Sequence, residues 1–198
     1  MTLNFESFMR AIWQSIIDPA EMARRIKEMR FDMGSLWAAL ALTAVLNVLL
    51  LAGLQMVSPV PMTFQDQMIT LTPFTYTVMI SSFLFLFVFA TQKVGQLMGG
   101  QGSLAQTVAI VVWFQAVSLT LEIGQLALML FSPLASALFG MVSLGALLWC
   151  MVNFITVLHE FESRAKSIGT LVVALLGTAF GAGMLLALLG VGAVGGTI

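Results

Sequence analysis

The feature that most constrains this chain is an almost uninterrupted run of apolar residues from 104 to 158. The run is too long for one membrane span, which needs about 20 residues, but long enough for two. Ser132 and Pro133 form the break in it and predict spans at 104–131 and 135–158. Over the whole chain 60% of residues are apolar and only 9% are charged, so the chain cannot cover a water-facing surface and its solvent must be lipid.

Three further apolar segments of span length predict membrane helices at 36–57, 70–91 and 168–189. The sequence therefore predicts an all-α polytopic membrane protein, a five-span helical bundle that occupies residues 36–190. Residues 1–35 precede it as cytoplasmic amphipathic helices, and residues 191–198 follow it as a short external tail.

The positions of the basic residues predict the orientation. All eight Lys and Arg residues fall within 1–35, 92–103 and 159–167, which share one side of the membrane in a five-span arrangement. Because basic residues concentrate on the cytoplasmic side, the N-terminus should be cytoplasmic and the C-terminus outside.

The first 30 residues predict two amphipathic helices. In the first, apolar residues recur at helical spacing, and the sequence Asp18-Pro19-Ala20-Glu21 is typical of the start of a second helix. We expect both helices at the cytoplasmic membrane surface, with the first lying either on lipid or on the bundle. The candidate lipid or partner contacts are Phe5, Phe8, Ile12, Trp13, Arg24, Arg25, Lys27 and Arg30.

Glu122 is the only acidic residue inside a predicted span. Ionisable residues within the membrane are costly and often functional, so Glu122 is a candidate proton or cation site together with Asn47, Gln115 and Gln125. The simpler explanation is a neutral, hydrogen-bonded carboxyl group that ties helices together, or one that reaches the membrane interface.

Two glycine-containing segments and one charged turn are explained by helix packing and chain turns, without a binding site. Gly177 and Gly181 have the spacing that lets helices approach closely, either within the bundle or in a homo-oligomer. Gly99, Gly100 and Gly102 fit a turn between spans, and His159 belongs to a mixed-charge turn that we expect to be solvated.

The sequence contains no set of residues typical of a catalytic site, which argues against an enzyme. Its one Cys and one His exclude the usual zinc sites. We expect no metal, other cofactor or nucleic-acid partner.

Three stretches of the sequence resemble the Yip (Ypt-interacting protein) domain family, in its bacterial branch. They are WQSIIDPAEMARRI (13–26), KVGQLMGGQGSLAQTVAIVVW (93–113) and VNFITVLHEFESRAKSIGTLVVALL (152–176). The resemblance implies five spans, a cytoplasmic N-terminal segment and a bacterial inner membrane. Eukaryotic relatives are associated with Rab-type GTPases, but their DLYGP-type motif is replaced here by IIDPAE at 16–21.

Three functions fit these features. The first is a non-enzymatic membrane scaffold or membrane-organising protein, which would bind lipids and a membrane or cytoplasmic protein through residues 5–30. The second is a small transporter or lipid-handling protein with a polar site around Glu122. The third is an accessory subunit of a larger membrane complex.

Overall fold

The computed structural model describes residues 4–57, 63–64, 67–68 and 73–188. Within these residues the chain forms seven helices and one short antiparallel strand pair. The helices are α1 (Phe5–Ile17), α2 (Pro19–Glu28), α3 (Met33–Val57), α4 (Pro73–Leu97), α5 (Leu104–Phe131), α6 (Pro133–His159) and α7 (Arg164–Leu188). The strands are β1 (Thr63–Phe64) and β2 (Gln67–Met68).

Five of these helices, α3 to α7, are long and apolar enough to cross a membrane. The predicted fold class, a five-span helical bundle with N-terminal amphipathic helices, is therefore confirmed. The helices α4 and α7 extend beyond the apolar segments on the side of α1 and α2, since α4 continues to Leu97 and α7 already begins at Arg164. Residues 70–72 of the second predicted span, residue 189 of the fifth, residue 190 of the predicted bundle and the tail at 191–198 lie outside the described residues.

Capping residues determine where three of the helices begin. Asp18 caps α2 by accepting a hydrogen bond from the Glu21 amide at 3.1 Å, with Pro19 at the first helical position. Ser132 caps α6 in the same way, and Pro133 follows it, so α5 and α6 separate there into an antiparallel hairpin. Ser103 and Gln106 form a reciprocal capping box at the start of α5.

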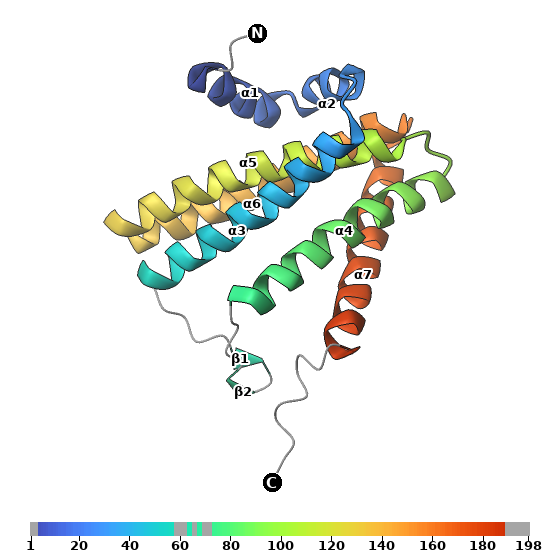
Figure 1. Cartoon of the computed structure of the whole chain (residues 1–198). Helices are drawn as coiled ribbons and strands as arrows, with labels where there is room; N and C mark the ends of the chain where they lie inside the picture. The colour runs from blue at the N-terminus through green and yellow to red at the C-terminus, as the bar shows by residue number, and fades with distance from the viewer. Residues whose placement is uncertain (1–3, 58–62, 65–66, 69–72, 189–198) are drawn as a thin grey trace.

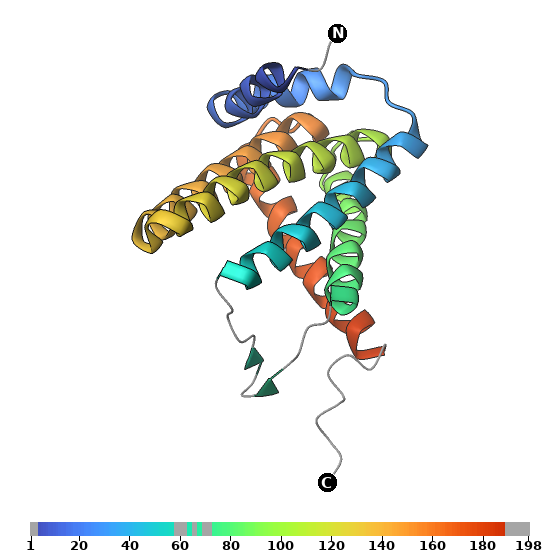
Figure 2. The same ribbon diagram turned by 60° about the vertical axis from the view of Figure 1, so that its left-hand side comes forward.

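The spans form two packed groups beneath an N-terminal layer (Figure 1). α3, α5 and α6 lie side by side, while α4 and α7 pack against each other and are inclined to them, as the turned view also shows (Figure 2). α1 and α2 lie across α5 and α6.

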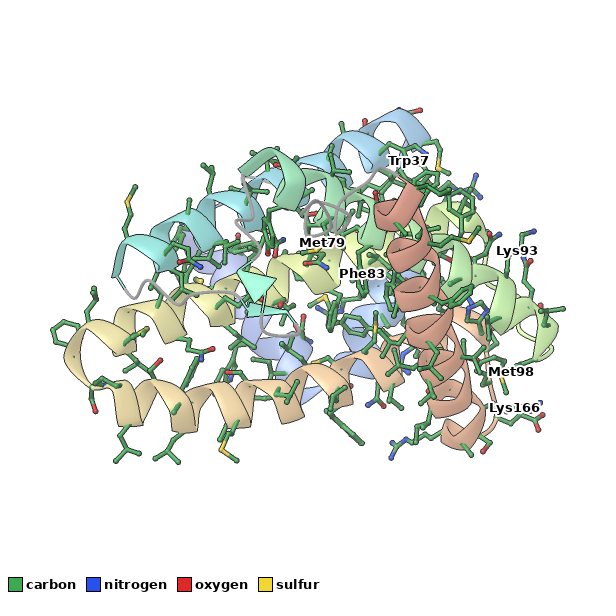
Figure 3. All side chains as sticks on the ribbon, turned by 90° about the horizontal axis from the view of Figure 1, so that it is seen from below. Trp37, Met79, Phe83, Lys93, Met98 and Lys166 are labelled. Atoms are coloured by element: carbon green, nitrogen blue, oxygen red, sulfur yellow. The ribbon has the colours of Figure 1, made fainter. Side chains whose placement is uncertain are left out.

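Seen from below, Lys93 and Lys166 lie with Met98 on the side formed by α4 and α7 (Figure 3), where the Thr170 hydroxyl contacts the Met98 sulfur at 3.1 Å.

The hydrophobic core lies in the half of the bundle nearest α1 and α2. Phe154, Val108 and Val88 are fully buried there, and Trp37 stacks on Phe89 with ring centroids 6.1 Å apart. The spans diverge toward the opposite end (Figure 1). Because the core is concentrated in one half, that half holds the helices together, and the divergent half has room for a cavity.

Candidate functional site

Helix α1 presents three different sectors, and one of them is docked on the bundle. Ile12 and Ser15 are buried in this sector. The Trp113 indole of α5 donates a hydrogen bond to the Ser15 hydroxyl at 2.9 Å, and the Cys150 thiol of α6 donates one to the Ser15 carbonyl at 3.0 Å. Phe8 packs edge-on against Trp113. Of the two positions that the sequence left open, docking on the bundle is therefore the one the structure shows.

A second sector of α1 is apolar yet faces away from the bundle. It consists of Phe5, Met9, Trp13 and Ile17, which follow one another at four-residue spacing and which we call the outer stripe. Phe5 is 77% exposed, and Trp13 and Ile17 are each 64% exposed. The third sector is polar, with Glu6 and Arg10 joined by an exposed ion pair. A helix with bundle, apolar and water-facing sectors is suited to the edge of a membrane, beside the protein and at the lipid surface.

Helix α2 uses its whole apolar face for docking. Met22, Ala23 and Ile26 are buried against α5 and α6 and belong to the main core. Burial of side chains of the size of Met or Ile contributes about 1.5–3 kcal/mol each. The apolar face of α2 is thus part of the hydrophobic core.

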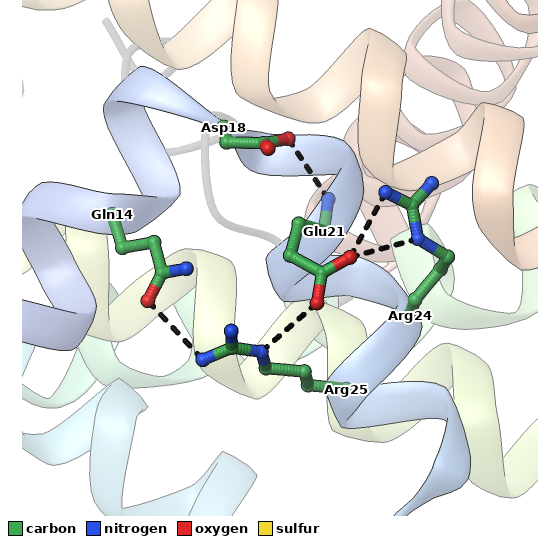
Figure 4. A network of polar contacts seen from close by, with 5 residues as sticks. All are labelled: Gln14, Asp18, Glu21, Arg24 and Arg25. Carbon is green, nitrogen blue, oxygen red and sulfur yellow. Dashed lines mark hydrogen bonds and ion pairs between the residues drawn. The ribbon is translucent and has the colours of Figure 1, made fainter.

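The water-facing side of α2 carries a small charge network (Figure 4). The Glu21 carboxylate pairs with Arg24 at 3.0 Å and with Arg25 at 3.1 Å, and Arg25 also donates to the Gln14 side chain of α1. These hydrogen bonds to Arg24 and Arg25 lower the pKa of Glu21. The network links α1 to α2 and leaves both guanidinium groups exposed. Arg30, just beyond α2, is exposed as well.

Lys27 joins α2 to the turn between α6 and α7. Its ammonium group lies 2.5 Å from the Glu160 carboxylate and 3.4 Å from the Val157 carbonyl. The hydrogen bond and charge of Lys27 lower the pKa of Glu160 below its ordinary value of 4.5. Among the four basic residues predicted to contact lipid or a partner, Lys27 therefore forms an ion pair within the protein instead.

Acidification should loosen this link. Because the pKa of Glu160 is lowered in the folded state, its contribution is present above pH 4.5 and is lost as the pH falls through the lowered value. Glu21 titrates in the same direction. Hydrogen–deuterium exchange of the α2 amides, corrected for intrinsic exchange, should rise below pH 4.5. Glu160→Gln should already raise exchange at pH 7, whereas Glu162→Gln, at an exposed position that forms no ion pair in the described part of the chain, should leave it unchanged.

The prediction that His159 lies in a solvated turn is wrong. His159 is 1% exposed, and its Nδ1 accepts a hydrogen bond from the Gly102 amide at 3.3 Å. A Cβ atom at Gly95, Gly100 or Gly102 would overlap the side chain of His159. These glycines make room for the imidazole, which ties the α4–α5 turn to the α6–α7 turn. The glycines and the histidine were visible in the sequence, but nothing in it indicated their contact across 57 residues.

The structure brings the predicted intramembrane polar residues together. The Asn47 amide of α3 donates to Gln115 of α5 at 3.4 Å, and Ser118 donates to Glu122 at 2.7 Å. Asn47, Glu122 and Gln125 line one cavity of about 210 Å³ in the divergent half of the bundle. Among the described residues, those that line the cavity are Asn47, Leu50, Leu51, Leu54, Tyr76, Glu122, Gln125, Leu126, Met129 and Ser136. Gln115 is outside this lining and reaches it only through Asn47.

The two candidate packing glycines of α7 differ in their surroundings. A Cβ atom at Gly181 would lie 3.3 Å from the Leu86 side chain of α4, so the helices approach closely there. At Gly177 a Cβ atom would meet no atom within 4 Å. Close packing within the described part of the bundle thus involves Gly181 and not Gly177.

The fold and these surfaces define a five-span helical membrane protein with a docked, amphipathic N-terminal layer. The chain belongs to the Yip1 domain family, whose model matches residues 13–194. The match covers α2 and all five spans and begins inside α1 at Trp13. Comparison with curated proteins and with solved structures found no match.

Proposed function

We propose that this protein is a non-enzymatic membrane scaffold that works through the layer formed by α1 and α2. The observation that carries the proposal is the division of α1, where one sector is fixed on α5 and α6 while the outer stripe remains exposed. An apolar stripe held rigidly against a bundle can enter the lipid surface without unfolding. The exposed Arg24, Arg25 and Arg30 beside it suit anionic headgroups or an acidic protein surface.

The proposed location is a bacterial inner membrane with α1 and α2 on the cytoplasmic side. All eight basic residues support this orientation, because they precede α3 or lie at the ends of helices on the same side of the bundle. The C-terminus is then outside. A homo-oligomer and a further protein partner are both compatible with this arrangement.

The experiment replaces Phe5, Trp13 and Ile17 together by Ser in the full-length chain. None of the three is buried, so the thermal unfolding midpoint should stay within about 2 °C of the wild type. Mass spectrometry of proteins and lipids that co-purify in mild detergent should then show that a wild-type partner or lipid is lost. Removal of residues 1–30 is a poorer test, since it also removes Ile12, Met22 and Ile26 from the core. If every co-purifying component stays at wild-type level, the outer stripe is not the working surface.

A second candidate function, a small transporter or lipid-handling protein, is supported by the polar cavity at Glu122. If this function is correct, Glu122→Gln should abolish movement of the transported molecule in proteoliposomes. The third candidate, an accessory subunit of a larger complex, has no observation of its own to favour it.

A further inference from the structure

The cavity in the divergent half of the bundle is rich in hydrogen-bond acceptors. Glu122 contributes a carboxyl group, Asn47 an amide oxygen, and Tyr76 and Ser136 hydroxyl oxygens. Donors of two of these residues are already used, since Asn47 donates to the Thr43 carbonyl and Ser136 to the Gln125 carbonyl. Their oxygens therefore remain as acceptors, so the cavity can bind a ligand that donates hydrogen bonds.

The charge around the cavity selects a cation. No Lys, Arg or His is among the described residues that line the cavity. The nearest end of α5, at Phe131, is nine residues beyond Glu122, or about 13 Å along the helix. In this low-dielectric setting a carboxylate without a basic partner attracts a positive charge strongly.

The number of carboxylates in the cavity and its apolar lining residues indicate which class of cation fits. Among the described residues no cluster of three or more His, Cys, Asp or Glu side chains could hold a metal ion, and this cavity has only Glu122. One carboxylate suits a singly charged group. Half of the lining is apolar, namely Leu50, Leu51, Leu54, Leu126 and Met129, and offers contact to a hydrocarbon chain.

We propose that this cavity binds a primary alkylammonium group, with the ammonium on Glu122 and Asn47 and the alkyl chain along the leucines. The ammonium has three donors for the acceptors present. The same chemistry occurs in a free amine and in the amine headgroup of a phospholipid. The inference rests on the second candidate function, but it concerns binding alone, and binding can occur without transport.

The experiment measures binding of butylammonium to the full-length protein by titration calorimetry in nanodiscs of phosphatidylcholine, which has no primary amine. Saturable binding to the wild type is expected, with butan-1-ol, butyrate and sodium ions unable to compete. Glu122→Gln keeps the side-chain shape and should weaken binding at least tenfold. Glu162→Gln, a matched change at an exposed position outside the cavity, should bind as the wild type does.

Two outcomes would overturn the proposal: no saturable binding to the folded wild type, or equal competition by butan-1-ol or by sodium. Binding of butylammonium and competition by the other probes are measured on the wild type, so the proposal can be rejected even if Glu122→Gln does not fold. A repeat in phosphatidylethanolamine nanodiscs distinguishes the sources. Weaker apparent binding there identifies the lipid headgroup as the occupant, and unchanged binding identifies a free amine. Binding without movement of butylammonium across proteoliposomes would contradict the transport function and leave the binding site in place.

Discussion

Replacement of Gly95 by Ala is expected to destabilise the protein by about 3 kcal/mol, the upper part of the range for overpacked cores. The new Cβ atom would overlap the imidazole ring of His159, which is fully buried and cannot swing into solvent. A Cβ atom at Gly100 would overlap the His159 side chain as well, so Gly100 also leaves no spare room around the imidazole. For a chain of this size the loss corresponds to a decrease of roughly 6–12 °C in the thermal unfolding midpoint. The measurement is thermal unfolding of the purified protein in detergent.

Gly145→Ala is the matched control for this change. Gly145 lies inside α6, and a Cβ atom there would meet nothing within 4 Å. Since Ala favours a helix over Gly by about 1 kcal/mol, the control should be neutral or slightly stabilising. Gly95→Ala combined with His159→Ala should cost less than the sum of the two single changes, because the overlap is gone. Strictly additive effects would contradict the contact between Gly95 and His159.

Ala23→Asp should release helix α2 from the bundle. Ala23 is 0% exposed and lies in the core between α2 and the spans, so the new carboxylate would be buried without a partner. Burial of an unpaired charge costs several kcal/mol, comparable to what Met22 and Ile26 contribute by docking. The helix should therefore leave its site while the five spans remain folded. Limited trypsin digestion should then cut rapidly after Arg24 and Arg25, because their side chains are exposed in both states but the docked helix holds their peptide bonds in a helical conformation that resists cleavage.

Met29→Asp controls for the added charge. Met29 ends α2 and is 53% exposed, so an acid there meets water and costs only a few tenths of a kcal/mol up to about 1 kcal/mol at the helix C-terminus. Its trypsin pattern should match the wild type. Equal cleavage of both variants would mean that α2 is not held by its apolar face.

The sequence was sufficient to predict the features that depend on neighbouring residues. Span number follows from runs of apolar residues, and the start of α2 follows from Asp18 and Pro19. The separation of α5 and α6 at Ser132 and Pro133 has the same local origin, because a capping hydroxyl and a proline act within one turn of helix.

The remaining features depend on contacts between distant segments. His159 is buried because Gly95 of α4 and two glycines of the α4–α5 turn leave space for it, and the sequence alone gives no indication of that pairing. The helical spacing in α1 predicts an apolar face, but it does not say that Ile12 turns to the bundle while Trp13 turns away. Glu122 and Asn47 share a cavity because the spans diverge there, which depends on the packing of the opposite half.

Cysteine cross-linking in native membranes tests the docking of α1 most directly. Cys150 is the only cysteine of the chain and lies 3.0 Å from the Ser15 carbonyl. Single cysteines would be placed at Ile12 and Ser15, which face the bundle, and at Glu6 and Arg10, which face away. Under mild oxidation an intramolecular disulfide should form from position 15 or 12 and from neither outward position. Disulfides from the outward positions, or from none of the four, would contradict a docked α1 and with it the proposed scaffold surface.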